Sequence, residues 1–333
     1  MTAMIKTPDL RRADASGTRT GSLLRRHAET LRLLIPVAAL WVVLSILTPT
    51  FLTALNVTNI LVNAVPLALA AAGLTLVIIA GDLDLSVGST IALVSTASAT
   101  LMVTFHIPWP LALLAGLVLG AAVGAFNGLV STRLNVPSFI CTLAMMSAVR
   151  GLALVISDGR AVTGLPTGVT DLAATRFIGI PLVLWVPIIV IPALGLFLSR
   201  TSAGLNIYAV GGNREAARIA GVPVRRTRLL VLTISGLMAG FAGIVSTARL
   251  GVGSPIVAED LILDAIAAVV IGGTSLFGGI GRMGGTVLGV LLIATIRNGL
   301  VLMNVSAFYQ RIAIGVVILL AAIVDGLGRK NDD

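Results

Sequence analysis

Uninterrupted apolar runs recur along this chain, and each is long enough, at roughly 20 residues, to cross the hydrocarbon core of a bilayer as a helix. Only 11% of the 333 residues are charged and 57% are hydrophobic, whereas a soluble domain carries roughly 25% charged residues. The runs therefore predict an all-α, polytopic membrane protein of about ten transmembrane helices. We place the spans at 33–48, 62–80, 85–105, 110–130, 138–156, 177–199, 229–248, 261–278, 284–303 and 307–327.

The distribution of charge predicts how the spans are oriented. Residues 1–30 hold five arginines and no apolar run, which indicates a basic cytoplasmic arm that is retained rather than cleaved. The segment 200–228 holds six arginines against Glu215 alone, which is typical of a cytoplasmic loop. We therefore expect one transmembrane domain, 31–328, and a cytoplasmic tail, 329–333. The basic residues behind the net charge of +9 are concentrated in these cytoplasmic segments, so no nucleic-acid partner is expected.

Glycines repeat every four residues on several of the expected spans. Such faces let helix backbones approach closely, which matters because lipid supplies no hydrophobic force between helices. We expect a packing role for Gly116, Gly120, Gly124, Gly128, Gly236 and Gly240. Two stretches also resemble each other, 81–89 and 272–285, because each follows one apolar run and opens another. This similarity suggests an internal repeat of the kind found in transporters.

The stretch Gly81–Ser89 (GDLDLSVGS) joins the second and third spans. One interpretation is a simple inner turn in which Asp84 or Ser86 caps the third span. A second is a pathway or gate element, and a third is a site for a coupling proton or sodium ion on Asp82 and Asp84. The two carboxylates are two residues apart, so on a helix they would not face the same way.

A short helix is expected inside the loop 200–228. Asn213 is placed to cap residues 214–220, Glu215 lies in the favourable first turn, and Gly221 is placed to end the helix. Two helical turns are not stable alone in water, so the segment must dock on something. The residues alone leave two alternatives open: a groove on a cytoplasmic partner, or the inner surface of the membrane.

Four ionisable residues interrupt the apolar runs: Arg150, Asp264, Arg297 and Arg311. Charges in lipid are expensive and tend to pair, so we expect Asp264 to pair with one of the arginines, either structurally or with the long side chains reaching the interface. The chain has no Walker-type phosphate loop, no clustered histidines and no activated nucleophile. We therefore expect neither an enzyme nor a metal or cofactor held by this chain.

Three motifs in order resemble the ribose-type sugar permeases, the membrane subunits of bacterial ATP-binding-cassette importers. They are Gly81–Ser89, Ala209–Val222 (AVGGNREAARIAGV) and Ala265–Gly289 (AIAAVVIGGTSLFGGIGRMGGTVLG). The likeness covers about 35–327, although Asp82 stands where the family more often has glycine. Branched-chain amino-acid permeases share the broad fold, but the wording DLDLSVGS favours the sugar branch.

The resemblance implies a multi-pass permease of the bacterial inner membrane. It would carry a monosaccharide such as ribose, xylose or galactose, or a polyol, and would form a homodimer. Its partners would be a periplasmic sugar-binding protein and a cytoplasmic ATPase that holds ATP and Mg. The implied ATPase-coupling residues are Asn213, Arg214, Glu215, Ala216, Ala217, Arg218, Ile219, Ala220 and Gly221. The candidate pathway or gate residues are Asp82, Asp84, Ser86, Gly88, Ser89, Gly272, Gly273, Thr274 and Asn298.

Two rival hypotheses belong to other classes. An ion-coupled secondary transporter would use Asp82 or Asp84 as its ion site and would need no ATPase. A membrane scaffold would move nothing and would offer the short helix to a different partner.

Overall fold

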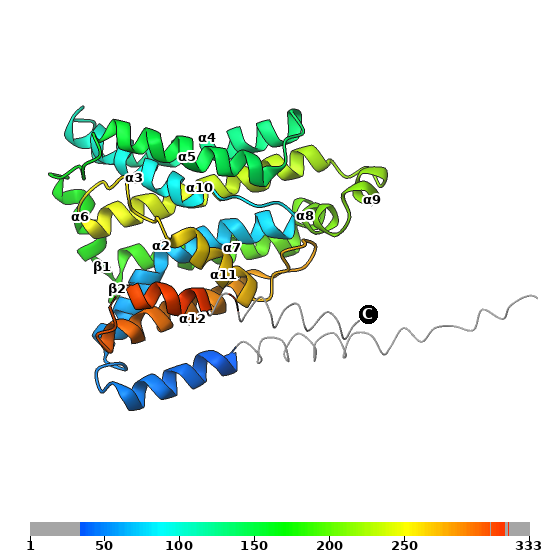
Figure 1. The fold of residues 1–333 in the computed structure, drawn as a ribbon. Coiled ribbons are helices and arrows are strands. Elements are labelled where there is room, and N and C mark those ends of the chain that lie inside the picture. Colours follow the sequence, from blue (N-terminus) through cyan, green and yellow to red (C-terminus); the bar gives the residue numbers. More distant parts are fainter. Residues whose placement is uncertain (1–33, 307, 317–318, 320–333) are drawn as a thin grey trace, which may run out of the picture.

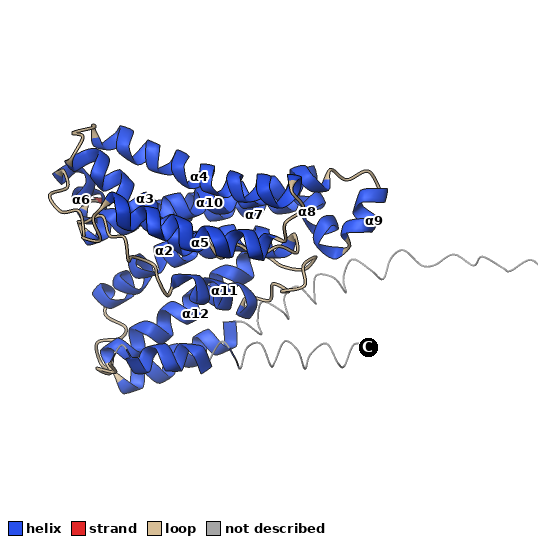
Figure 2. Cartoon of the chain, turned by 45° about the horizontal axis from the view of Figure 1, so that its top comes forward, coloured by secondary structure: helices blue, strands red, loops and turns tan. Residues whose placement is uncertain are grey.

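The computed structural model describes residues 34–306, 308–316 and 319. The chain is a bundle of helices with one two-stranded hairpin (Figures 1 and 2). A helix spans Leu34–Leu47. The elements that follow are α2 (Ala54–Ile79), α3 (Val87–Val103), α4 (Trp109–Arg133), α5 (Ser138–Ile156), α6 (Thr167–Ala174), β1 (Arg176–Phe177), β2 (Ile180–Pro181), α7 (Leu182–Arg200), α8 (Ser202–Gly212), α9 (Arg214–Ile219), α10 (Val224–Leu250), α11 (Leu261–Ile271) and α12 (Met283–Leu302).

Within the described ranges, six helices are long and apolar enough to cross a membrane: α2, α4, α5, α7, α10 and α12. The helix 34–47, α3 and α11 are apolar but shorter. These helices run side by side in Figure 1, with α8 and α9 at one end and α6 and the hairpin at the other. The structure is thus that of an all-helical, polytopic membrane protein. The count of ten spans and the side on which the termini lie stay predictions, because about half of 307–327 and both chain ends lie outside the described residues.

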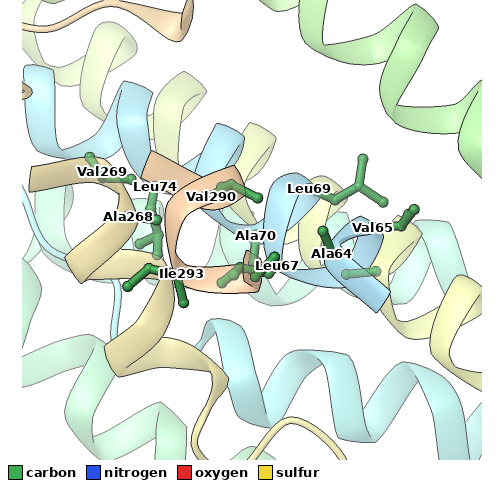
Figure 3. Packing of buried hydrophobic residues seen from close by; sticks show 14 of the residues in the cluster. Ala64, Val65, Leu67, Leu69, Ala70, Leu74, Ala268, Val269, Val290 and Ile293 are labelled. Atoms are coloured by element: carbon green, nitrogen blue, oxygen red, sulfur yellow. The ribbon is translucent and has the colours of Figure 1, made fainter. Parts of the chain in front are cut away.

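Helix α2 forms the centre of the bundle. It contacts α7, α10, α11 and α12, and 83% of its most apolar stretch is buried inside the protein. Leu69, Leu74 and Ile78 belong to the main hydrophobic cluster, which α11 and α12 complete with Ala268 and Ile293 (Figure 3). A helix that is apolar all round is buried rather than amphipathic, and the sequence of α2 has this character.

Several elements begin or end away from the expected limits. Helix α2 begins at Ala54 rather than residue 62, because the Thr53 hydroxyl accepts a hydrogen bond from the Asn56 amide and caps it. Helix α10 begins at Val224 rather than 229, directly after a proline that suits a helix start. The expected span 261–278 is only the 11-residue α11, which gives way at Gly272 to glycine-rich loop structure.

Helices α3 and α11 begin inside the bundle and not at its end. Asp84, just before α3, accepts a hydrogen bond from the hydroxyl of Ser235, which lies eleven residues into α10, or about 16 Å along that helix. The carbonyl oxygen of Ala258, just before α11, lies 2.7 Å from where a Cβ on Gly88 would be. The first turn of α3 and the irregular segment that leads into α11 therefore meet within the bundle.

Candidate functional site

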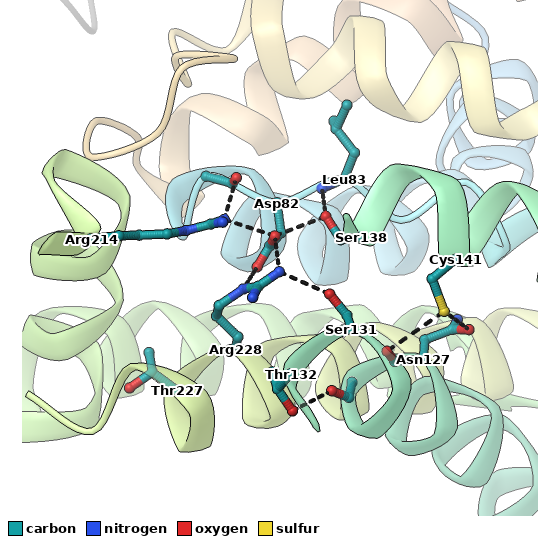
Figure 4. A network of polar contacts seen from close by, with 12 residues as sticks. Asp82, Leu83, Asn127, Ser131, Thr132, Ser138, Cys141, Arg214, Thr227 and Arg228 are labelled. Carbon is teal, nitrogen blue, oxygen red and sulfur yellow. Dashed lines mark hydrogen bonds and ion pairs between the residues drawn. The ribbon is translucent and has the colours of Figure 1, made fainter. Parts of the chain in front are cut away.

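Asp82 is the centre of a polar network at the end of the bundle that carries α8 and α9 (Figure 4). Its two carboxylate oxygens accept bonds from Nε and Nη2 of Arg228 at 2.7 and 2.8 Å, a bidentate pair. Nη2 of Arg214 and Oγ of Ser138 each donate to Oδ1 at 2.8 Å. Asp82 is only 4% exposed. A buried carboxylate that accepts this many hydrogen bonds, two of them from one guanidinium, is fixed in position.

Asp84 is buried in a separate environment. Its Oδ1 accepts bonds from the backbone N–H and the hydroxyl of Ser86, at 3.0 and 2.6 Å. Its Oδ2 accepts from the Ser235 hydroxyl at 2.8 Å, and Asn127 donates to the Ser86 hydroxyl at 2.9 Å. The N-cap of α3 is Ser86, and no side chain caps the helix, so the expected capping role of Asp84 or Ser86 is wrong. Asp84 instead holds Ser86 in place and ties this residue to α10, while Asn127 ties it to α4. Asp82 and Asp84 have no hydrogen-bond partner in common, which agrees with their spacing of two residues in the sequence.

The expected docking helix is present as α9, one residue shorter than predicted because Ala220 is its C-cap. The Asn213 side chain caps it by accepting from the Ala216 amide at 2.9 Å. Glu215 and Arg218 form an exposed pair with bonds of 2.6 and 3.0 Å, and this hydrogen bond holds the pKa of Glu215 below its usual value. Ile219 is 77% exposed at the tip of the molecule. The described chain therefore leaves an apolar residue uncovered on α9.

Three of the sequence motifs meet at a glycine junction made by Gly81, Gly211, Gly278 and Gly279. The Gly279 amide donates to the carbonyl of Ile79 at 2.8 Å. A Cβ on Gly211 would overlap that same carbonyl oxygen and would lie 2.6 Å from the Gly279 nitrogen. A Cβ on Gly278 would lie 2.9 Å from the Cα of Gly81. The end of α2, the end of α8 and the loop 272–282 are thus in direct backbone contact.

Three other expected pathway residues lie in the loop 272–282 that forms part of the glycine junction, and Ser89 lies on α3. Gly272 packs against the backbone of Gly285, and Gly273 has a φ of +84°. The hydroxyl of Thr274 is buried, and no described residue forms a hydrogen bond with it. The Ser89 hydroxyl donates to the Met146 carbonyl of α5 at 2.7 Å.

Asn298 lies far from Asp82, towards the other end of α12. It forms a reciprocal amide pair with Asn56, with distances of 2.8 and 3.0 Å. Next to it, Arg297 forms an ion pair with Asp264, one of the pairings expected from the sequence. The other two arginines have different partners: Arg311 pairs with Asp260 at 2.6 Å, and Arg150 donates to the backbone carbonyls of residues 255 and 257.

Sequence reasoning missed several residues of the Asp82 network. Arg228 was counted only among the basic residues of a loop, although it lies on α10 and is 12% exposed. Ser138 follows a proline at the start of α5, and Ser131 accepts a bond from Arg228 at 2.8 Å. Gly211 lies inside the motif 209–222, but nothing in the sequence marked it as a contact of Ile79. A useful signal would have been the position of Arg228, which directly precedes the apolar run 229–232.

Comparison with known proteins identifies the family to which the chain belongs. Residues 56–322 match the family model described as "Branched-chain amino acid transport system / permease component". The ribose import permease protein RbsC of Bacillus subtilis is 43% identical over 286 residues, which cover 85% of this chain and 88% of that protein. The probable ABC transporter permease protein YphD of Escherichia coli is 42% identical, covering 90% of each. The D-allose transport system permease protein AlsC of Escherichia coli is 39% identical, covering 84% of this chain and 86% of that protein. No solved structure matches.

The long apolar helices and the glycine contacts between them are those of a multi-pass membrane protein, and the relatives are permeases. The chain belongs to the permease family matched by that model, and within it to the sugar permeases of ATP-binding-cassette importers. It is accordingly a multi-pass protein of the inner membrane. Importers of this family imply an ATPase and a substrate-binding protein as partners.

Proposed function

We propose that this chain is the translocating subunit of an importer that carries a monosaccharide or a related polyol into the cytoplasm. A separate ATPase, with its own ATP and Mg, docks on α9 and drives the cycle. A periplasmic binding protein delivers the sugar to the opposite end of the bundle, and two copies of the chain form the pathway. The relatives named for ribose and allose import support the sugar class.

The bond between Arg214 and Asp82 carries this proposal. Arg214 is the first residue of α9, and its Nη2 donates at 2.8 Å both to Asp82 and to the carbonyl of Gly81. The exposed docking helix is therefore attached directly to the loop that opens α3. Because Arg228 of α10 forms an ion pair with the same carboxylate, a displacement of α9 would move α3 and α10 together.

The glycine junction offers a second route for the same displacement. Gly211 lies two residues before the Asn213 cap of α9 and touches the end of α2 and the loop 272–282. In alternating access, closure of the ATPase pair would displace α9. The Arg214–Asp82 bond and the glycine junction would transmit this displacement to α2, α3 and α11. Coupling of this kind needs contiguous elements with two discrete arrangements, and backbone packed against backbone deforms little.

The ion-coupled alternative has less support. Two guanidinium groups and a hydroxyl already occupy the Asp82 carboxylate, so a cation would have to displace Arg228 from a bidentate pair. Both oxygens of Asp84 accept hydrogen bonds, from Ser86 and from Ser235. An ion gradient as the energy source predicts uptake that an uncoupler abolishes and that ATP depletion alone does not.

Affinity purification of the tagged full-length chain from native membranes, followed by mass spectrometry, tests the coupling role. A stoichiometric ATP-binding-cassette ATPase should co-purify with the unchanged protein. Glu215→Lys breaks the pair with Arg218, and Gly221→Pro is incompatible with a φ of +81°. Both variants should insert normally, lose the ATPase and lose uptake.

Asp171→Lys is the matched control for the charge reversal, because it replaces an exposed acid with lysine in α6, at the opposite end of the bundle. It should retain the ATPase. If both docking-helix variants retain the ATPase and normal ATP-dependent uptake, α9 is not the coupling element. If membranes that still take up sugar yield no ATPase with the unchanged protein, the ion-coupled transporter replaces the importer.

A further inference from the structure

A polar cavity of about 340 Å³ lies between α2, α11 and α12, away from the Asp82 network. Its polar lining comes from Asn63, Asp264, Arg297, Asn298 and Gln310. The remaining lining side chains are aliphatic, and none is aromatic. Ligand cavities in proteins hold roughly 300–1,000 Å³, so this one suits a small ligand.

The cavity lies within the apolar part of the bundle. Asn63 is the tenth residue of α2, or about 14 Å along that helix. Asp264 lies in the first turn of α11, the helix that begins inside the bundle. The Arg297 side chain is nevertheless 44% exposed in the single chain. A half-exposed guanidinium at this depth would be expensive against lipid, which favours a water-filled lumen on this face.

The polar groups around the cavity match a neutral, hydroxyl-rich molecule. Asp264 and Arg297 form an ion pair, so their formal charges cancel and neither an anion nor a cation is preferred. The Asn63 carbonyl accepts from Arg249, which leaves its amide nitrogen without a described partner. The second oxygen of Asp264 and the Nε of Arg297 also have no hydrogen-bond partner among the described residues. The cavity thus presents donors and acceptors together, as a hydroxyl group requires.

Building on the function proposed above, we infer that this cavity is a transient binding subsite for an uncharged monosaccharide inside the permease. Asn63, Asp264 and Arg297 would hydrogen-bond its hydroxyl groups. None of the described lining residues has an aromatic ring on which a sugar could stack, so the subsite would hold its ligand weakly. Weak binding is what a translocation pathway needs, because the sugar must also leave.

Substituted-cysteine labelling tests the subsite without requiring the ATPase. The chain has one cysteine, the buried Cys141, which is first changed to alanine. Val301→Cys then places a reporter in the cavity lining but outside the hydrogen-bonding set. Leu61→Cys is the matched control, since Leu61 lies on α2 two residues before Asn63 and faces the apolar groove beside α7. Native membranes are treated with a charged, membrane-impermeant thiol reagent, with and without D-ribose, D-allose or L-arabinose.

Val301→Cys should react with the reagent, and at least one of the three sugars should slow the reaction several-fold, whereas choline chloride at the same osmolarity should not. Leu61→Cys should show no protection.

Adding Asn63→Leu should raise the sugar concentration needed for protection by about five- to tenfold, the effect of one lost hydrogen bond. A reporter that does not react, or one that reacts but is protected by none of the sugars, overturns the subsite. If the unchanged protein yields no ATPase in the co-purification experiment, the proposed energy source is overturned and this result is unaffected.

Discussion

At the scale of single residues, Asp82 shows how one side chain can join three elements. The family resemblance leads us to expect glycine at this position, and glycine cannot accept a hydrogen bond through a side chain. In this chain Arg214 and Arg228 supply the opposing charge, from α9 and α10. The sequence made Asp82 a candidate but could not name its partners, because they lie 132 and 146 residues away.

Asp82→Asn should destabilise the protein strongly. Removing one partner of a buried ion pair costs about 3–5 kcal/mol, because the other charge is left uncompensated. Arg228 is that charge, at 12% exposed, whereas Arg214, at 44%, can turn towards water. The measurement is the midpoint of thermal unfolding of the purified chain in mild detergent.

The double variant Asp82→Asn with Arg228→Met should recover part of the loss, since it removes both charges together. A single variant that unfolds at the same temperature as the unchanged protein would contradict the role given to the pair. So would a double variant that is less stable than the single one by the full cost of a second independent change.

At the scale of elements, the glycine repeats allowed the close helix contacts to be predicted from the sequence. The four-residue repeats on α4 and α10 face each other, so that Gly120 and Gly124 meet Gly236 and the residues around it. Most apolar spans were also located, because composition alone decides whether a segment can lie in lipid. The shortness of α11 was not predicted, since the run 261–278 stays apolar while Gly272 and Gly273 end the helix.

Gly124→Ala should destabilise the contact between α4 and α10. A Cβ at this position would overlap the carbonyl oxygen of Leu232 and lie 3.0 Å from the Gly236 Cα, so backbone must move. Overpacking of this kind costs about 1–3 kcal/mol. Gly151→Ala is the control, because nothing lies within 4 Å of its added Cβ on α5. The control should be neutral or more stable by about 0.5–1 kcal/mol, through helix propensity. Equal melting temperatures for the two variants would contradict close packing at Gly124.

At the scale of the whole molecule, motifs that are separate in the sequence meet at one end. Residues 81–89, 209–222 and 265–289 each looked like a local feature, and nothing in a single sequence indicates that they touch. Their meeting depends on the path of α2 through the bundle and on the return of the chain after α11. The polar cavity was missed for the same reason, because Asn63 is 201 residues from Asp264 and 234 from Arg297.

Gly211→Ala should reduce uptake at least tenfold, whereas Gly212→Ala should leave it near normal. An added Cβ on Gly211 overlaps the Ile79 carbonyl, but one on Gly212 has nothing within 4 Å. The two variants add the same methyl group to adjacent residues of α8, so they differ only in what that group meets. Uptake in whole cells, normalised to the amount of permease in the membrane, is the measurement. Similar uptake by both variants would exclude a role for the glycine junction in coupling.

The shortness of α11 also has a consequence for biosynthesis. Eleven residues of helix reach about 16 Å, roughly half of the hydrocarbon thickness. The segment 251–260 before it is largely irregular and would leave backbone amides unpaired if it entered lipid alone. A translocon that releases helices into the bilayer one at a time therefore cannot release this one as a finished span. It must wait until α12 has emerged, and α2 and α10 must already be in place to receive the two together.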